Sequence, residues 1–232
     1  MLKVLPAMLG CIGLVTSLNV LADNALTSQK DKQSYSIGIN LGMQLSQQKD
    51  EIDVDKVILG LKDVFAGQQP KLTMEEMQQV MMTFQKTIQE KQQAQIKAVA
   101  DANAKEGKDF LAANKKKDGV KTLASGLQYK VLQSGKGDSP KVTDTVVTHY
   151  RGSLINGQVF DSSYQRGEPA TFPVNGVIKG WTEALQKMKV GDKWQLFIPS
   201  DLAYGEHGAG QSIGPNAVLI FEIELLEIKK SS

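Results

Sequence analysis

The sequence predicts an α+β fold, in which an all-α N-terminal region with a long connecting helix precedes an antiparallel sheet wrapped around one short helix. Apolar residues recur every three or four positions in the first half of the chain, as in amphipathic helices, and alternate with polar residues in the second half, as in half-buried strands. Turn residues separate the alternating segments at short intervals. With 232 residues, 22% of them charged, and a net charge of +2, the composition is that of a soluble globular protein and favours no nucleic-acid partner.

The first 22 residues are predicted to be a secretory signal peptide. Lys3 supplies a short positive region, and residues 4–21 form an apolar stretch. Residues 20–22 (VLA) fit the small-residue cleavage rule, which predicts cleavage before Asp23. We therefore expect an exported protein in the periplasm, the outer membrane or at the cell surface. The alternatives are an N-terminal transmembrane anchor and a lipoprotein signal in which Cys11 is lipidated.

Cysteine and histidine are scarce. Cys11 is the only cysteine, so the mature protein would contain no disulfide, although its compartment would allow one. The only histidines are His149 and His207, and no His/Cys cluster has metal-ligand spacing. We expect no metal and no cofactor.

Residues 23–70 are predicted to form a helical dimerisation domain. Apolar residues at helical spacing mark one helix within residues 30–47, where Gly38 and Gly42 offer a small-residue face, and a second helix from residue 52 that Gly67 ends. About fifty residues with so much apolar surface make a poor core alone. A symmetric homodimer would bury that surface. The alternative is that these helices fold back on the C-terminal domain.

Residues 71–117 are predicted to form one long connecting helix. The sequence from Lys71 to Glu106 contains neither glycine nor proline, and Thr73 with Glu76 forms a capping box. At 1.5 Å per residue, the helix would span roughly 50–60 Å. Its C-terminal half carries few apolar residues, so we expect that half to be a solvated strut.

Residues 118–232 are predicted to form the sheet domain. Strands are expected at 127–132, 145–150, 194–198 and 218–228, and one short helix at 180–186. Asn156-Gly157 is a strong signal for a tight hairpin.

The same domain carries six short motifs in a fixed order. They are 147–152 (VTHYRG), 157–163 (GQVFDSS), 177–181 (VIKGW), 203–205 (AYG), 213–216 (IGPN) and 219–222 (LIFE). Together they resemble the FKBP-type peptidyl-prolyl cis/trans isomerases. The whole chain, including residues 34–38 (SYSIG) and 125–130 (SGLQYK), is similar to the Mip (macrophage infectivity potentiator) group of bacterial FKBPs.

This resemblance implies a pocket that holds a proline ring. Trp181 corresponds to its floor, Ile213 to its rim, and Tyr204 and the Ile178 backbone to groups that hydrogen-bond substrate carbonyls. Asp161 corresponds to a carboxylate beside the reacting amide, where Arg166 commonly pairs with it and with a tyrosine hydroxyl. The apolar walls correspond to Tyr150, Phe160, Val177, Ile178 and Phe221.

Two positions depart from the family pattern. Ala170 stands where many eukaryotic members have an aromatic wall, so we expect a pocket more open on that side. Ala209 stands where some members have a histidine near the rim, and His207 does not occupy that position. We expect these changes to affect affinity and sequence preference more than activity itself.

These residue types suit prolyl isomerisation. Rotation about an X-Pro bond breaks no covalent bond but crosses a barrier of about 18–20 kcal/mol, so no nucleophile is needed. A dry aromatic pocket favours the twisted amide, which has less charge separation than the planar one. Asp161 could oppose the rotating carbonyl oxygen or orient Tyr150, and the sequence does not decide between these roles.

The leading hypothesis is an exported, homodimeric prolyl isomerase that assists protein folding, with chaperone activity and a role in virulence implied by the resemblance. Its partners would be proline-containing unfolded or extracellular polypeptides, and macrolide inhibitors of the family. The alternative is a non-catalytic dimeric module that binds proline peptides, for example in adhesion. Aromatic residues at strand spacing are also common in ordinary cores, and Asp161 could simply begin a turn.

Overall fold

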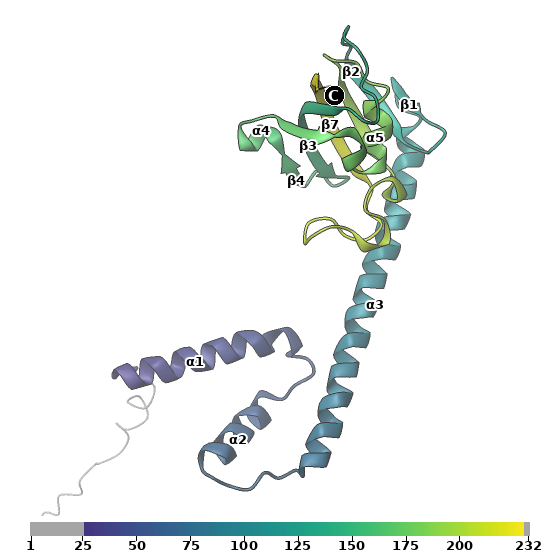
Figure 1. Ribbon diagram of the computed structural model, residues 1–232. Coiled ribbons are helices and arrows are strands. Elements are labelled where there is room, and N and C mark those ends of the chain that lie inside the picture. The colour runs from purple at the N-terminus through teal and green to yellow at the C-terminus, as the bar shows by residue number, and fades with distance from the viewer. Residues whose placement is uncertain (1–25, 230–232) are drawn as a thin grey trace, which may run out of the picture. The chain divides into compact units, whose positions relative to one another are not determined.

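The computed structural model describes residues 26–229 (Figure 1). They form two units, the first ending at Met82 and the second beginning at Thr83. The predicted signal peptide over residues 1–22, including Cys11, lies outside the described residues. Within residues 26–229, no helix has the length and apolar character needed to cross a membrane. Helices precede an antiparallel sheet, which confirms the predicted α+β class.

The first unit is entirely helical. Helix α1 (Gln29–Leu45) runs into the 3₁₀ turn η1 (Ser46–Gln48), and α2 (Val54–Phe65) and the start of α3 (Met74–Asn114) follow. The predicted capping box at the start of α3 is present, because the Thr73 N–H donates to Glu76 Oε2 at 2.8 Å and the Glu76 N–H donates to Thr73 Oγ1 at 3.2 Å. These bonds satisfy two N–H groups that a helix start leaves unpaired.

Apolar side chains of the first unit lie largely in solvent. Among its described residues only Asp63 is buried, and it pairs with Lys71. Phe65 at the end of α2 is 90% exposed. Gly38 and Gly42 of α1 have no atom within 4 Å of the position where a Cβ would stand. The single chain therefore provides no hydrophobic core for these helices.

The second unit contains a seven-stranded antiparallel sheet with the order β1-β2-β6-β7-β3-β4, and β5 pairs with β3. The strands are β1 (Val120–Thr122), β2 (Gln128–Gln133), β3 (Thr145–Leu154), β4 (Val159–Ser162), β5 (Ala170–Pro173), β6 (Lys193–Ile198) and β7 (Leu219–Lys229). The predicted Asn156-Gly157 hairpin joins β3 to β4, and Gly157 adopts the left-handed φ of +86° that this turn requires.

Helix α5 (Lys179–Leu185) packs on the sheet as predicted (Figure 1). Its buried residues Trp181, Ala184 and Leu185 join the core that the sheet residues Leu196 and Ile223 also form. The remaining short elements are α4 (Ser163–Arg166), η2 (Val174–Gly176), η3 (Ser200–Leu202) and η4 (Gly205–His207). Strands β1, β4 and β5 were not predicted, because three or four residues are too few to show alternation.

The expectation that the C-terminal half of the long helix is a solvated strut is wrong for its last turns. Gly107 and Asn114 are buried. The Phe110 ring lies 5.9 Å from the ring of Phe197 in β6, and Asn114 Nδ2 donates to Gln128 Oε1 at 3.0 Å. The end of α3 is therefore part of the sheet domain.

Candidate active site

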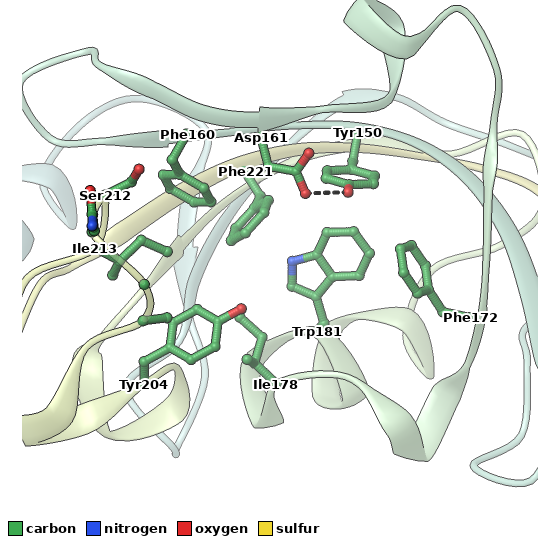
Figure 2. A pocket seen from close by; sticks show the side chains of 13 residues that line it. Tyr150, Phe160, Asp161, Phe172, Ile178, Trp181, Tyr204, Ser212, Ile213 and Phe221 are labelled. Atoms are coloured by element: carbon green, nitrogen blue, oxygen red, sulfur yellow. Dashed lines mark hydrogen bonds between the residues drawn. The ribbon is translucent and has the colours of Figure 1, made fainter.

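A pocket of about 410 Å³ opens on the sheet domain. Figure 2 shows side chains from β3, β4, β5, β7 and α5 converging on it, with Tyr204 and Ile213 on the side away from Phe172. The lining residues are Tyr150, Phe160, Asp161, Phe172, Ile178, Trp181, Tyr204, Ala209, Gly210, Gln211, Ser212, Ile213 and Phe221.

The floor of the pocket is a cluster of aromatic rings around Trp181, which is 4% exposed. Its ring makes edge-to-face contacts with Tyr150, Phe172 and Phe221, at centroid distances of 5.2, 5.8 and 5.1 Å. Edge-to-face pairs add about 0.5–1.5 kcal/mol each beyond area burial. They hold the indole in one orientation and leave little of its surface exposed.

The wall formed by Phe160 and Phe221 depends on Gly152. Gly152 lies opposite Phe221 in the β3–β7 ladder. A Cβ at Gly152 would stand 2.6–2.7 Å from both rings. The absence of a side chain at this position allows the two rings to meet edge to face, 5.5 Å apart.

One edge of the pocket is polar. The Tyr150 hydroxyl donates to Asp161 Oδ2, as the dashed line in Figure 2 marks. Arg166 donates from Nη1 to Asp161 Oδ1 and from Nη2 to the Tyr150 hydroxyl, the latter at 2.8 Å. The guanidinium also lies 5.4 Å from the centre of the Tyr150 ring. The three side chains therefore hold one another in place.

This arrangement keeps the Tyr150 hydroxyl protonated. Burial raises the pKa of Tyr150, and its hydrogen bond to the Asp161 carboxylate raises that pKa further. The hydrogen bonds to Tyr150 and Asp161 also raise the pKa of Arg166. At neutral pH the pocket edge thus carries a neutral phenol beside an ion pair.

Ser163, the first residue of α4, bonds to the backbone of Tyr150. Its buried hydroxyl accepts from the Tyr150 N–H at 2.8 Å and donates to the Tyr150 carbonyl at 3.2 Å. His149 Nδ1 lies 3.0 Å from the same hydroxyl, and its ring stacks on Tyr164. His149, a residue of β3, is thus a packing residue. The sequence analysis did not identify this supporting role of Ser163.

The opposite side of the pocket is a loop, residues 205–217, which we call the flap. Tyr204 precedes it and is 41% exposed. Its tip is closed by two backbone hydrogen bonds, from the Ala209 N–H to the Ile213 carbonyl at 2.8 Å and from the Ile213 N–H to the Ala209 carbonyl at 3.1 Å. The flap therefore presents a short, bonded loop to the pocket.

The structure brings most of the expected site residues together. Tyr150, Phe160, Asp161, Ile178, Trp181, Tyr204, Ile213 and Phe221 line the pocket. Arg166 does not line it but bonds to two residues that do. Val177 lies outside this pocket, is partly buried against the core, and lines a shallow neighbouring hollow with Thr182 and Leu202.

Phe172, Gln211 and Ser212 line the pocket but were not predicted from the sequence. Phe172 lies two residues after Ala170 in β5, so both side chains share one face of the sheet. Phe172 lines the pocket and contacts Trp181, on the side where the alanine predicted an opening. The alternation of Ala170 and Phe172 is the signal that could have identified it.

Among the described residues, no group of three or more His, Cys, Asp or Glu side chains is arranged to hold a metal ion. The pocket instead combines a dry aromatic floor with hydrogen-bond donors at its edges. Such a site can bind a small apolar ring and fix the polar groups on either side of it.

Two family models match this chain. Residues 136–226 match the model described as FKBP-type peptidyl-prolyl cis-trans isomerase. Residues 30–131 match the model described as the domain amino-terminal to FKBP-type peptidyl-prolyl isomerase. The two matches together cover both units of the structure.

Individual relatives are similar over nearly the whole length. The peptidyl-prolyl cis-trans isomerase Mip of Coxiella burnetii is 48% identical over 219 residues, which are 94% of this chain and 95% of the relative. The outer membrane protein MIP of Legionella longbeachae is 44% identical over 231 residues, covering 100% and 99%. The crystal structure of FkpA from Escherichia coli matches with a TM-score of 0.76 at 40% identity, covering 90% of this chain and 100% of that chain.

Proposed function

Because the chain belongs to the family of FKBP-type peptidyl-prolyl cis-trans isomerases, we propose that the pocket floored by Trp181 is its active site. The chain is a peptidyl-prolyl isomerase of this family, so the non-catalytic alternative is not retained. The observation that carries the proposal is the aromatic floor with a polar edge, since isomerisation needs a dry place for the proline ring and fixed partners for the flanking carbonyls.

The proline ring lies on the Trp181 indole between the rings of Tyr150, Phe160 and Phe221. A planar X-Pro amide has more charge separation than the twisted one, so removal from water disfavours the planar ground state. The pocket thereby lowers part of the barrier of about 18–20 kcal/mol. No bond to the enzyme forms at any stage.

Two hydrogen-bonding groups, the Tyr204 hydroxyl and the Ile178 backbone, fix the substrate backbone. The Tyr204 hydroxyl points into the pocket (Figure 2) and donates to a substrate carbonyl. The backbone at Ile178, where α5 begins, holds the carbonyl on the other side of the proline. Holding both flanks lets one amide rotate while the rest of the peptide stays in place.

Asp161 acts by orienting Tyr150. Both of its carboxylate oxygens already accept hydrogen bonds, one from Tyr150 and one from Arg166. This pairing supports the positioning role over direct repulsion of the rotating oxygen, the two roles that the sequence left open. The oriented Tyr150 ring then forms the wall against which the amide turns.

We expect the same pocket to bind the macrolide inhibitors that the family resemblance implies. Their recognition would use the Trp181 floor and the Tyr204 hydroxyl, as substrate does. Competition between a macrolide and a proline peptide is therefore expected.

Variants of the polar partners test the site in a prolyl isomerisation assay without a protease. Tyr204→Phe should lower kcat/KM about two- to tenfold, because a hydrogen bond contributes about 0.5–1.5 kcal/mol net. Asp161→Leu should lower it on the order of tenfold or more, because hydrogen bonds to charged groups contribute about 1.5–3 kcal/mol.

Tyr164→Phe is the matched control, since Tyr164 is 44% exposed, close to the 41% of Tyr204, but bonds to Glu224 instead of lining the pocket. It should keep wild-type activity. Full activity in both Asp161→Leu and Tyr204→Phe would remove the assignment of the site to this pocket.

A homodimer formed through the first unit is the second part of the proposal. The exposed apolar residues of α1 and α2, and the open surface at Gly38 and Gly42, support it. A second copy of the same helices would bury this surface with self-complementary contacts. The match of residues 30–131 to the domain that precedes the isomerase in this family also supports it.

Export and chaperone activity complete the proposal. The signal-like residues 1–22 support export, and the relative from Legionella longbeachae is named an outer membrane protein. Two pockets in one dimer would raise the effective concentration of each for a client bound at the other. Weak contacts to unfolded polypeptides would then add up to useful affinity.

A further inference from the structure

The last part of α3 contacts the flap through two asparagine side chains. Asn103 Nδ2 donates to the Pro215 carbonyl at 2.8 Å. Asn216 Nδ2 donates to the Ala100 carbonyl at 3.4 Å, in the opposite direction. These bonds join residues more than a hundred positions apart in sequence, within the second unit.

Asn216 links this contact to the pocket. Its backbone N–H donates to the Gly205 carbonyl at 2.8 Å, and Gly205 directly follows Tyr204. Asn216 is also the one described residue other than glycine with a positive φ, +56°. This backbone conformation is less favoured for residues other than glycine, and the hydrogen bonds of Asn216 help to maintain it.

Gly214 completes the contact on the other side of Pro215. A Cβ at Gly214 would stand 3.0 Å from Asn103 Nδ2 and 3.6 Å from Val99 Cγ1. Ile213, the residue before it, is 8% exposed and lines the pocket. The helix therefore contacts the flap at residues 214–216, which are bonded to Gly205 beside Tyr204 on one side and adjoin Ile213 at the tip on the other.

We propose that Asn103 and Asn216 form a clasp that positions the flap, so that α3 is a working part of the isomerase site and not only a connector. The proposal rests on the proposed function of the pocket. Asn103 and Asn216 do not line the pocket and act through Tyr204 and Ile213, which makes them positioning residues.

The kinetic consequence follows from what the flap contributes. Residues 209–213 line the pocket and would hold the substrate in the ground state and in the twisted state alike. Loosening such a contact raises KM more than it lowers kcat. One lost hydrogen bond corresponds to a change of about two- to tenfold.

Asn103→Leu in the full-length protein tests the clasp. Leucine has the same branching as asparagine, although it is larger, and it makes no side-chain hydrogen bond. It also favours helix more strongly, so a loss does not arise from a weaker helix. Asn216→Gly is the second variant, because glycine accepts the positive φ while losing the side-chain bond. Ala104→Leu is the control, since residue 104 is the exposed neighbour on α3.

Two properties are measured on the same samples. The first is KM and kcat for a proline peptide, and the second is the rate of amide hydrogen exchange in residues 205–217, with the rate in β3 as the reference. We expect both clasp variants to raise KM about two- to tenfold with a smaller change in kcat, and to speed exchange in the flap but not in β3. Ala104→Leu should match the wild type in all of these.

Wild-type KM and wild-type flap exchange in Asn103→Leu would overturn the proposal. So would a loss of activity that merely follows the unfolded fraction and leaves KM unchanged. Failure of the assigned pocket is a different result, since it shows as full activity in Asp161→Leu and Tyr204→Phe, whereas flap exchange reports on the clasp alone.

Discussion

Tyr150 is the residue at which the apolar and polar parts of the pocket meet. Its ring packs against Trp181, and its hydroxyl bonds to Asp161 and Arg166. The raised pKa of Tyr150 follows first from burial and then from the Asp161 carboxylate. The hydroxyl therefore stays protonated throughout the physiological range.

The pH dependence follows from this shift. A pKa raised on folding stabilises the protein fully below the unfolded value of about 10, and the contribution is lost as pH rises through the folded value. The difference in thermal midpoint between wild type and Tyr150→Phe should be constant from about pH 6 to 9. Above about pH 10 the midpoint of the wild type should fall relative to that of Tyr150→Phe. Thermal melts by circular dichroism would measure it, and a change centred near neutral pH would contradict this assignment.

The positioning role of Asp161 predicts that its effect on rate depends on Tyr150. In a cycle of Asp161→Leu, Tyr150→Phe and the double variant, the losses in kcat/KM should not add. The double variant should be no more impaired than the worse single variant, within about twofold, because both changes break the same unit. Fully additive losses would favour direct action of Asp161 on the substrate.

The site residues that could be predicted from the sequence are those whose side chains perform the chemistry. Trp181, Asp161 and Tyr204 stand in motifs whose order identifies them, and the structure brings all three to one pocket. Phe172 and Ser163 were not predicted, since a phenylalanine in a short strand and a serine in a turn have many ordinary uses. Their roles appear only when the strands are paired.

At the scale of elements, α3 shows what composition predicts and what it does not. The absence of glycine and proline up to Glu106 predicted the long helix, which spans Met74–Asn114. The docking of its last turns was not predictable, because the contact partners Phe197 and Val218 lie far along the chain. From the sequence alone, Gly107 is expected to weaken the helix. In the structure, its lack of a side chain allows α3 to pack closely against Val218.

Gly107→Ala should therefore destabilise the protein. A Cβ at this position would stand 2.6 Å from Val218 Cγ2. Overpacking costs about 1–3 kcal/mol, against a gain of about 1 kcal/mol in helix propensity. Urea unfolding should give a lower free energy of unfolding for Gly107→Ala than for wild type.

Val218→Ala supplies the matched partner, because it removes the methyl group that the new Cβ would meet. The double variant should be more stable than the sum of the two single changes predicts, by about 1 kcal/mol. A stabilising effect of Gly107→Ala alone would show that α3 does not pack closely at this point.

At the scale of the molecule, the two units differ in how they achieve stability. The second unit has its own core, whereas the described part of the first buries no apolar side chain. Sedimentation of residues 23–232 should therefore give a dimer at micromolar concentration, and a fragment of residues 83–232 should be a monomer. A monomeric 23–232 species would remove the proposed dimer.

The point of truncation matters for the same experiment. A fragment beginning at residue 118 would lose Asn114 and the Leu111 carbonyl, the two partners of the buried Gln128 side chain. Because the truncation also uncovers the Gln128 side chain, water can replace these partners, and the loss is that of two intramolecular hydrogen bonds, about 0.5–1.5 kcal/mol each. The contacts of α3 with Phe197 and Val218 are lost as well. The 118–232 fragment should unfold at lower urea concentration than 83–232, and equal midpoints would contradict the docking of α3.

The central claim is that proline isomerisation takes place on the Trp181 indole. The most direct test records the two indole N–H signals by NMR while a peptide with one central proline is added, and follows cis/trans exchange of the peptide in the same sample. Trp194, buried beside Tyr129 and outside the pocket, is the internal control. We expect a saturable shift of the Trp181 signal, with no shift of Trp194, as exchange accelerates. Accelerated exchange with an unmoved Trp181 signal would contradict it.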